Sequence, residues 1–135
     1  MVRPLGSESL SLRDESDLLL ARRLVRERAT ELGFGVLDLT RIVTAASELG
    51  RNTLIHGGGG TMLLETLVQD ERRGVRLTFE DNGPGIADVE QAMTDGFTTK
   101  GGLGLGLGGS KRIVHEFDVV SRVGEGTRVT VTRWT

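Results

Sequence analysis

The sequence predicts an α+β fold, a two-layer α/β sandwich in which helices cover one face of a mixed, mainly antiparallel sheet. The expected elements run strand, helix, helix, strand, strand, helix, glycine loop, helix, strand, strand, and strands that follow strands favour this class over strict β-α alternation. The length of 135 residues, of which 37% are hydrophobic, fits a single domain, residues 1–135, with one core. Glycine accounts for 20 residues, about twice its usual share, which indicates loops with unusual backbone demands.

The N-terminal half predicts one strand followed by two helices. Residues 9–12 alternate polar and apolar side chains, and residues 14–17 supply the cap and first-turn acids of a helix that ends before Gly33. A second helix begins at Asp38 and ends at the four glycines 57–60. Apolar side chains recur at helical spacing in both segments: Leu18, Ala21, Val25, Ala29 and Leu32, then Ile42, Ala45, Ala46, Leu49 and Thr53.

The C-terminal half predicts two hairpins separated by helices and a glycine loop. The expected segments are strands at 61–69 and 75–80, a short helix at 89–94, the glycine loop at 96–109, a helix at 110–117 and two strands within 118–134. Turn-forming residues separate the members of each strand pair, Asp70–Gly74 in the first and Gly124–Gly126 in the second.

Composition and charge exclude several classes of function. A net charge of −2 and only four Phe and one Trp argue against a nucleic-acid partner, and the short apolar runs argue against a membrane span. The absence of cysteine excludes a disulfide framework and a thiolate metal site. Because residues 1–12 lack the apolar segment of a signal peptide, we expect a cytoplasmic protein.

A run of glycine and leucine at 101–109, directly before a predicted helix, suits a phosphate site. Glycine backbones approach an anion closely, and the amides at a helix start face it. A flexible loop is the commoner role of glycine runs. The dinucleotide fingerprint is matched formally by Gly104, Gly106 and Gly109 but lacks its β-α-β unit, and a Walker loop needs Lys before Ser, whereas this chain reads Ser110-Lys111.

Two polar clusters are also candidates for chemistry. The run Asp81–Gly85 follows a predicted strand and is typical of a tight turn, although a carboxylate at a strand end would equally accept a hydrogen bond from an adenine amino group. Glu48 and Asn52 lie four residues apart on one face of the second helix. They form either a polar helix edge or, with a carboxylate and an amide oxygen one turn apart, a site for magnesium-nucleotide chemistry.

The order of these motifs resembles the GHKL, or Bergerat-fold, ATPases. The matching segments are Glu48–Asn52, Asp81–Gly85, Gly96–Lys100 with the glycine loop, and Gly124–Thr127. Within that superfamily the single-domain length and the segment 97–100 are similar to the anti-sigma regulatory serine/threonine kinases. Further matches resemble the RsbT-type switch kinases of bacterial stress-signalling complexes: Glu31–Gly35, Ser47–Leu49, Asp95–Phe97 and Gly101–Gly104.

The resemblance implies an ATP site with Mg²⁺. Glu48 would be the polarising base, Asn52 the metal ligand, and Asp81 the acceptor of the adenine amino proton. The other nucleotide-binding residues would be Gly83 and Gly85 near the ring, Thr127 on a neighbouring strand, and Thr98, Thr99, Lys100, Gly102, Leu103, Gly104 and Gly106 in the lid and phosphate loop. In anti-sigma relatives the lid is longer and carries extra charges, whereas here it is almost pure glycine and leucine.

The implied activity is transfer of the γ-phosphoryl group of ATP to a serine or threonine of a STAS-domain antagonist. The kinase would then engage a second partner, such as a phosphatase activator domain. The alternatives are an ATP-binding anti-sigma factor that sequesters a sigma subunit, a nucleotide-gated interaction module with negligible transfer activity, and a detached histidine-kinase ATP-binding domain. Arg22 and Arg23 on the first helix form either a solvated basic face or a docking site for an acidic STAS partner.

Overall fold

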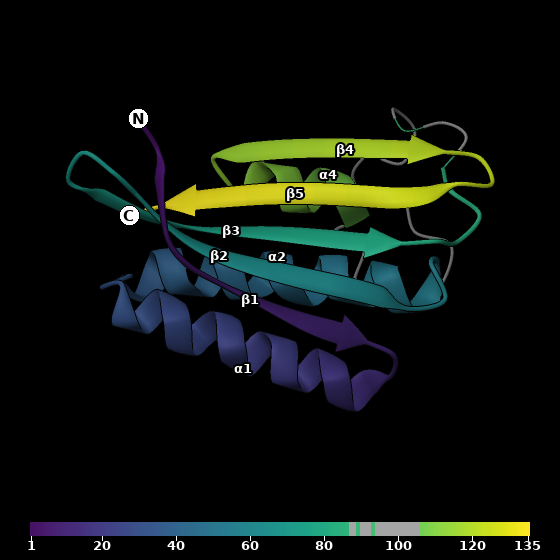
Figure 1. Cartoon of the computed structure of the whole chain (residues 1–135), viewed down its shortest axis with the longest axis horizontal. Coiled ribbons are helices and arrows are strands. Elements are labelled where there is room, and N and C mark those ends of the chain that lie inside the picture. Colours follow the sequence, from purple (N-terminus) through teal and green to yellow (C-terminus); the bar gives the residue numbers. More distant parts are fainter. Residues whose placement is uncertain (87–88, 90–92, 94–105) are drawn as a thin grey trace.

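The computed structural model describes residues 1–86, 89, 93 and 106–135, and these form one five-stranded sheet with helices on one face (Figure 1). The strands are β1 (Arg3–Leu12), β2 (Gly60–Gln69), β3 (Arg72–Asp81), β4 (Glu116–Arg122) and β5 (Gly126–Trp134), and the helices are α1 (Glu15–Glu31), α2 (Val36–Ile55) and α4 (Gly106–Arg112). Of the predicted helix at 89–94 only Val89 and Met93 are described, and the Met93 amide donates to the Val89 carbonyl at 3.0 Å.

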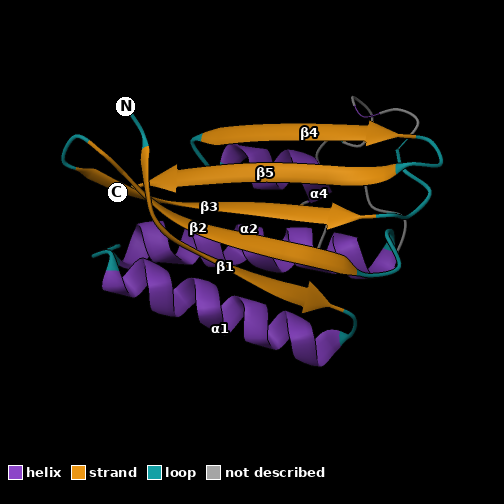
Figure 2. Cartoon of the chain, viewed as in Figure 1, coloured by secondary structure: helices purple, strands orange, loops and turns teal. Residues whose placement is uncertain are grey.

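The strand order is β1-β2-β3-β5-β4, and every neighbouring pair is antiparallel. The sheet was expected to be mixed, and its described strands are instead antiparallel throughout. Tight hairpins join β2 to β3 and β4 to β5, and such short connections enforce antiparallel pairing. β5, the last strand in the chain, therefore lies between β3 and β4 (Figure 2).

The core lies between the sheet and helices α1 and α2, as the predicted apolar stripes require. Alternate strand residues point to the helices and are buried: Met62, Leu64, Val75, Leu77, Phe79, Val129 and Val131. On α1, Leu18, Ala21, Val25 and Ala29 are buried, and on α2, Ile42, Ala45, Ala46, Leu49 and Thr53. The predicted two-layer sandwich is confirmed.

The helix predicted at 110–117 is wrong in its bounds, because α4 covers Gly106–Arg112 and β4 begins at Glu116. Low helix propensity makes glycines 106, 108 and 109 look like loop residues. In the structure, residues 107–110 are buried and α4 packs on α2, so tertiary packing overrides that propensity. β1 is also longer than expected, beginning at Arg3 instead of Ser9.

The end of β5 carries a network of paired polar side chains. Arg133, which is 7% exposed, donates from Nε and Nη2 to Asp38 Oδ1 at 3.0 and 2.6 Å, and from Nη1 to the carbonyl of Ile113 at 3.0 Å. The Trp134 amide donates to His115 Nδ1 at 2.9 Å. These bonds join the start of α2, the segment after α4 and β5.

Candidate functional site

The middle of α2 carries the predicted base and metal ligand. The Glu48 side chain is only 4% exposed, and its Oε1 lies 3.6 Å from Nη1 of Arg51. Asn52, one turn later on the same face, is half-buried. Its backbone carbonyl accepts hydrogen bonds from the amides of His56 at 2.9 Å and Gly57 at 3.2 Å, so the helix ends one turn beyond it.

Asp81 ends β3 and is held against the chain that leaves α2. Its Oδ1 accepts the Gly83 amide at 2.9 Å, and no hydrogen bond to Oδ2 is found within the described residues. A Cβ at Gly57 would lie 2.4 Å from Asp81 Cγ, and one at Gly83 would lie 2.7 Å from the Cα of Gly57. Glycine at both positions therefore brings the carboxylate next to the end of the helix that carries Asn52.

Thr127 lies opposite Asp81 in the pairing of β3 with β5. Its Oγ1 is 2.8 Å from Oγ of Ser121, which also accepts the amide of Ile86 at 2.8 Å. Ser121 was missed in the sequence analysis. The hairpin register around Gly124 pairs it with Thr127 and could have indicated it.

Two glycines allow backbone segments to cross closely at this end of the sheet. Gly85 has φ +76°, and a Cβ there would lie 2.1 Å from the carbonyl oxygen of Arg122. Gly126 has φ +89°, and its Cβ would lie 2.0 Å from the carbonyl oxygen of Asp81. The described structure thus gives Gly85 a packing role, and its predicted contact with the adenine ring stays a prediction.

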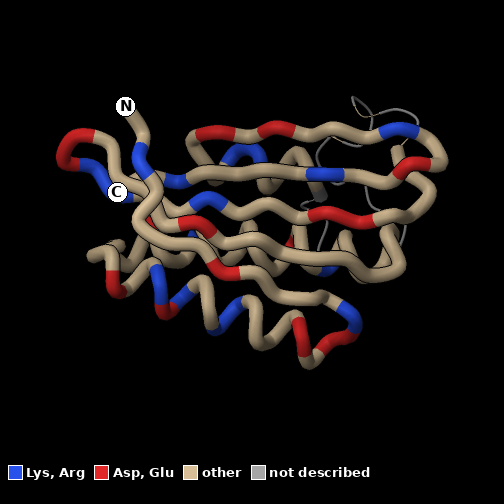
Figure 3. The backbone as a smooth tube through the Cα atoms, viewed as in Figure 1, with Lys and Arg blue, Asp and Glu red and all other residues tan. Residues whose placement is uncertain are grey.

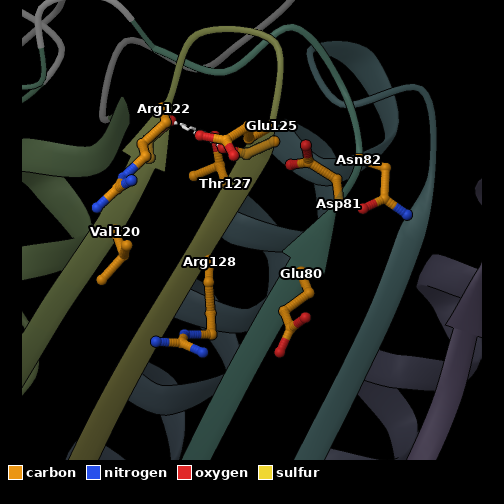
Figure 4. Close-up of a pocket in the computed structure, with 10 residues that line it drawn as sticks. Glu80, Asp81, Asn82, Val120, Arg122, Glu125, Thr127 and Arg128 are labelled. Atoms are coloured by element: carbon orange, nitrogen blue, oxygen red, sulfur yellow. Dashed lines mark hydrogen bonds between the residues drawn. The ribbon is translucent and has the colours of Figure 1, made fainter.

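An open depression of about 330 Å³ borders the ends of β3, β4 and β5 (Figure 4). It is lined by Glu80, Asp81, Asn82, Val120, Ser121, Arg122, Glu125, Gly126, Thr127 and Arg128. Glu80 pairs with Arg128 in the register, and Asp81 with Thr127, so the lining comes from both faces of the sheet. The depression includes Asp81 and Thr127 but neither Glu48 nor Asn52, and it is therefore not the whole predicted nucleotide site.

Several predicted site residues lie on other elements or outside the described residues. Thr98, Thr99, Lys100, Gly102, Leu103 and Gly104 lie outside the described residues. Gly106, predicted in the glycine loop, is instead the first residue of α4. Arg22 and Arg23 lie on α1, along which basic and acidic residues recur (Figure 3), and Arg22 Nε is buried with no hydrogen-bond partner among the described residues. No described helix is long and apolar enough to cross a membrane.

Comparison with known families agrees with this geometry. The family described as "Histidine kinase-, DNA gyrase B-, and HSP90-like ATPase" matches residues 37–134, which include α2, Asp81 and the β4–β5 hairpin. The chain belongs to this family of ATPases. The predicted membership of the GHKL superfamily is thereby confirmed.

Similar proteins indicate the class of activity within this ATPase family. The chain is 46% identical over 120 residues to "Serine/threonine-protein kinase RsbT" of Bacillus subtilis, an alignment that covers 89% of this chain and 90% of that protein. It is 36% identical over 99 residues to "Anti-sigma F factor" of Anoxybacillus flavithermus, covering 68% and 66%. These relatives confirm the predicted resemblance and the predicted class of activity, a kinase acting in sigma-factor regulation.

A solved structure has the same fold. The crystal structure of the RsbU and RsbW domains of Rv1364c from Mycobacterium tuberculosis matches with a TM-score of 0.66 and 23% identity, over 96% of this chain and 32% of that chain. A likeness at this identity concerns the fold alone, and it confirms the predicted α+β architecture of this ATPase family.

Proposed function

We propose that this ATPase is a cytoplasmic protein serine/threonine kinase whose substrate is a STAS-domain antagonist. The observation that carries the proposal is the position of Glu48, which is almost completely buried on the same face of α2 as Asn52. A carboxylate held in such a place is suited to accept a proton from a hydroxyl that comes within hydrogen-bond reach. The 46% identity to the RsbT kinase supports the substrate class.

The described residues fit a magnesium nucleotide. Gly57 lets the Asp81 carboxylate lie against the end of α2, where a Cβ would collide with it. Asp81 Oδ2 has no hydrogen-bond partner in the described ranges, so it could accept an adenine amino hydrogen. Within the same ranges no group of three or more His, Cys, Asp or Glu could hold a metal. Asn52 as a single protein ligand agrees with Mg²⁺, which usually keeps several waters and binds substrate phosphates.

The proposed step is an in-line phosphoryl transfer. The serine oxygen of the partner forms a bond to the γ-phosphorus while the bond from that phosphorus to the β-bridging oxygen breaks, so ADP leaves. Glu48 orients the hydroxyl and accepts its proton. When bound at Asn52, Mg²⁺ would neutralise charge on the triphosphate. The protein's own contribution is thus to position the reactants, with Asp81 and Thr127 binding the adenine end of the nucleotide.

Partner binding is proposed to use α1. Arg22 is half-buried and Arg23 exposed, and a basic pair of this kind would complement an acidic STAS surface. After phosphorylation the antagonist would leave, and the kinase would bind a phosphatase activator domain. The second candidate function is direct sequestration of a sigma factor, and the 36% identity to an anti-sigma F factor favours it.

The test of the main proposal uses Glu48→Gln, which keeps the side-chain shape and removes the charge. We expect calorimetry to give an unchanged nucleotide affinity, while transfer of labelled phosphate to a purified STAS-domain protein falls by about 100-fold or more. Retained transfer would exclude Glu48 as the base. Pull-down experiments that compare sigma factors with STAS proteins as partners distinguish the two candidate functions. Negligible phosphate transfer by the wild-type protein would favour a nucleotide-gated interaction module.

A further inference from the structure

Arg51 is a charged residue of α2 that the predicted site does not use. Its Nη1 lies 3.6 Å from Oε1 of Glu48, and the two side chains are 24% and 4% exposed. This is the ion pair that the described residues give Glu48. Arg51 lies one residue before Asn52 and Glu48 four residues before it, so both belong to the segment of α2 that carries the proposed chemistry.

Other ion pairs between residues three or four apart in the sequence each have one largely exposed partner. In the pair of Arg13 with Asp17 the arginine side chain is 78% exposed, and in the pair of Arg28 with Glu31 the carboxylate is 64% exposed. Exposed pairs of this spacing contribute only about 0.2 to 0.5 kcal/mol. Glu48 has the most buried carboxylate among the ion pairs of the described residues, so the Arg51 charge has a larger effect on it.

The distance indicates how Arg51 acts. The closest approach of the two side chains, 3.6 Å, lies beyond hydrogen-bond range. The arginine therefore acts on Glu48 as a nearby positive charge and does not form the two parallel bonds of a bidentate pair. A lysine at this position could supply much of the same charge.

We propose that Arg51 is a positioning residue, which keeps the buried Glu48 carboxylate charged and oriented so that it accepts the proton of the phosphoacceptor hydroxyl. This inference rests on the proposed role of Glu48 as the base. When the oxygen–phosphorus bond forms and ADP leaves, the proton goes to a Glu48 carboxylate oxygen. Arg51 itself exchanges no proton and stays a cation throughout.

The first test measures Glu48 without any partner or nucleotide. NMR titration of isotope-labelled glutamate side chains gives the pKa of Glu48, and Glu48→Gln identifies its signal by loss. We expect the pKa of Glu48 to be higher in Arg51→Gln than in the wild type, because a positive charge is lost, and to stay close to the wild type in Arg51→Lys. Lys111 on α4 and Asp81 at the end of β3, further charged groups on elements that pack against α2, remain in every variant. An unchanged pKa in Arg51→Gln would overturn the inference.

The second test measures the transfer of phosphate from ATP to the same purified STAS-domain protein. Arg51→Gln should lower kcat at neutral pH by about tenfold or more, with the acid limb of the pH–rate profile moved to higher pH and Kd for ATP within about threefold. Arg51→Lys should restore most of the rate. Arg73→Gln is the matched control, because Arg73 is exposed at the opposite end of β3 from Asp81. An acid limb that stays in place would overturn the proposal.

The two tests distinguish a failure of the proposed function from a failure of the coupling between Arg51 and Glu48. If the Glu48 pKa rises in Arg51→Gln but Glu48→Gln still transfers phosphate, the proposed function fails while the coupling of the two side chains stands. If Arg51→Gln does not fold, the double variant Glu48→Gln/Arg51→Gln decides. Recovery of folding in the double variant would identify the lone buried carboxylate as the cause and support the coupling, whereas a double variant that also fails to fold would overturn it.

Discussion

At the end of β5 the polar side chains are paired with one another, whereas at the opposite end of the sheet glycines bring backbone segments close together, and Asp81 Oδ2 has no hydrogen-bond partner among the described residues. Arg133 makes three hydrogen bonds there, and Trp134 Nε1 donates to Glu116 Oε2 at 2.9 Å. Around Asp81, by contrast, Gly57, Gly83 and Gly126 allow contacts that no other residue would permit. Side-chain pairing thus stabilises one end of the sheet, while the other is the end where we propose that adenine binds.

The largest expected effect is at Gly126, whose backbone lies close to the carbonyl of Asp81. Gly126→Ala places a Cβ 2.0 Å from the Asp81 carbonyl oxygen, and we expect the free energy of unfolding to fall by about 3 to 4 kcal/mol. Gly33→Ala is the control, because Gly33 has the same φ of +89° and no atom within 4 Å of its Cβ position. It should lose only about 1 kcal/mol. Equal losses in urea titrations would mean that backbone strain, not steric contact, requires glycine at Gly126.

The second largest effect is expected at the paired end of the sheet, where Arg133 lies. Arg133→Met removes the charge paired with Asp38 and the donor to Ile113, and should lower the free energy of unfolding by about 3 kcal/mol. Nucleotide affinity, measured by calorimetry on the folded protein, should stay unchanged because this network lies at the far end of β5 from Thr127. A large loss of affinity would show that the two ends are coupled.

A smaller effect is expected at the free acceptor itself. Asp81→Asn keeps an oxygen that can accept the Gly83 amide but removes the charge, so stability should change little. We expect ATP to bind about tenfold more weakly and the preference for ATP over GTP to decrease, measured in a competition titration. Unchanged selectivity would move adenine recognition away from Asp81.

The smallest effect is a pH dependence at the paired end. Desolvation of the ring, followed by the positive charges of Arg133 and Arg72, lowers the pKa of His115 below its ordinary value. The unfolded chain then binds the proton more readily, so the stability from this residue is complete near neutral pH and decreases as the pH falls through the ordinary histidine range. Thermal melts between about pH 7 and pH 5 should show a weaker pH dependence in His115→Asn than in the wild type.

The elements that could be predicted from the sequence are those in which the local pattern of apolar residues agrees with burial. The apolar stripes of α1 and α2 and the two hairpins could be predicted because their spacing is set by the periods of helix and strand. α4 could not, because glycines 106, 108 and 109 are helical only through packing against α2.

The same limit applies to the candidate site. The side chains of Glu48 and Asn52 follow from helical spacing, and Asp81 follows from its position at a strand end. The contact of Gly57 with Asp81 joins residues far apart in the sequence, so it depends on how α2 and β3 pack together. The contact between Ser121 and Thr127 follows from the register of the β4–β5 hairpin, which the predicted turn around Gly124 could have indicated. The burial that distinguishes Arg51 with Glu48 from an ordinary surface pair is likewise a tertiary property.

The central position of β5 has a consequence for biosynthesis. β4 pairs only with β5 among the described strands, and β3 meets β5 along its other edge, so this part of the sheet cannot assemble before residues 126–134 leave the ribosome. A nascent chain lacking them has no Thr127 beside Asp81. The proposed adenine-binding end of the sheet is therefore completed only when β5 is inserted between β3 and β4.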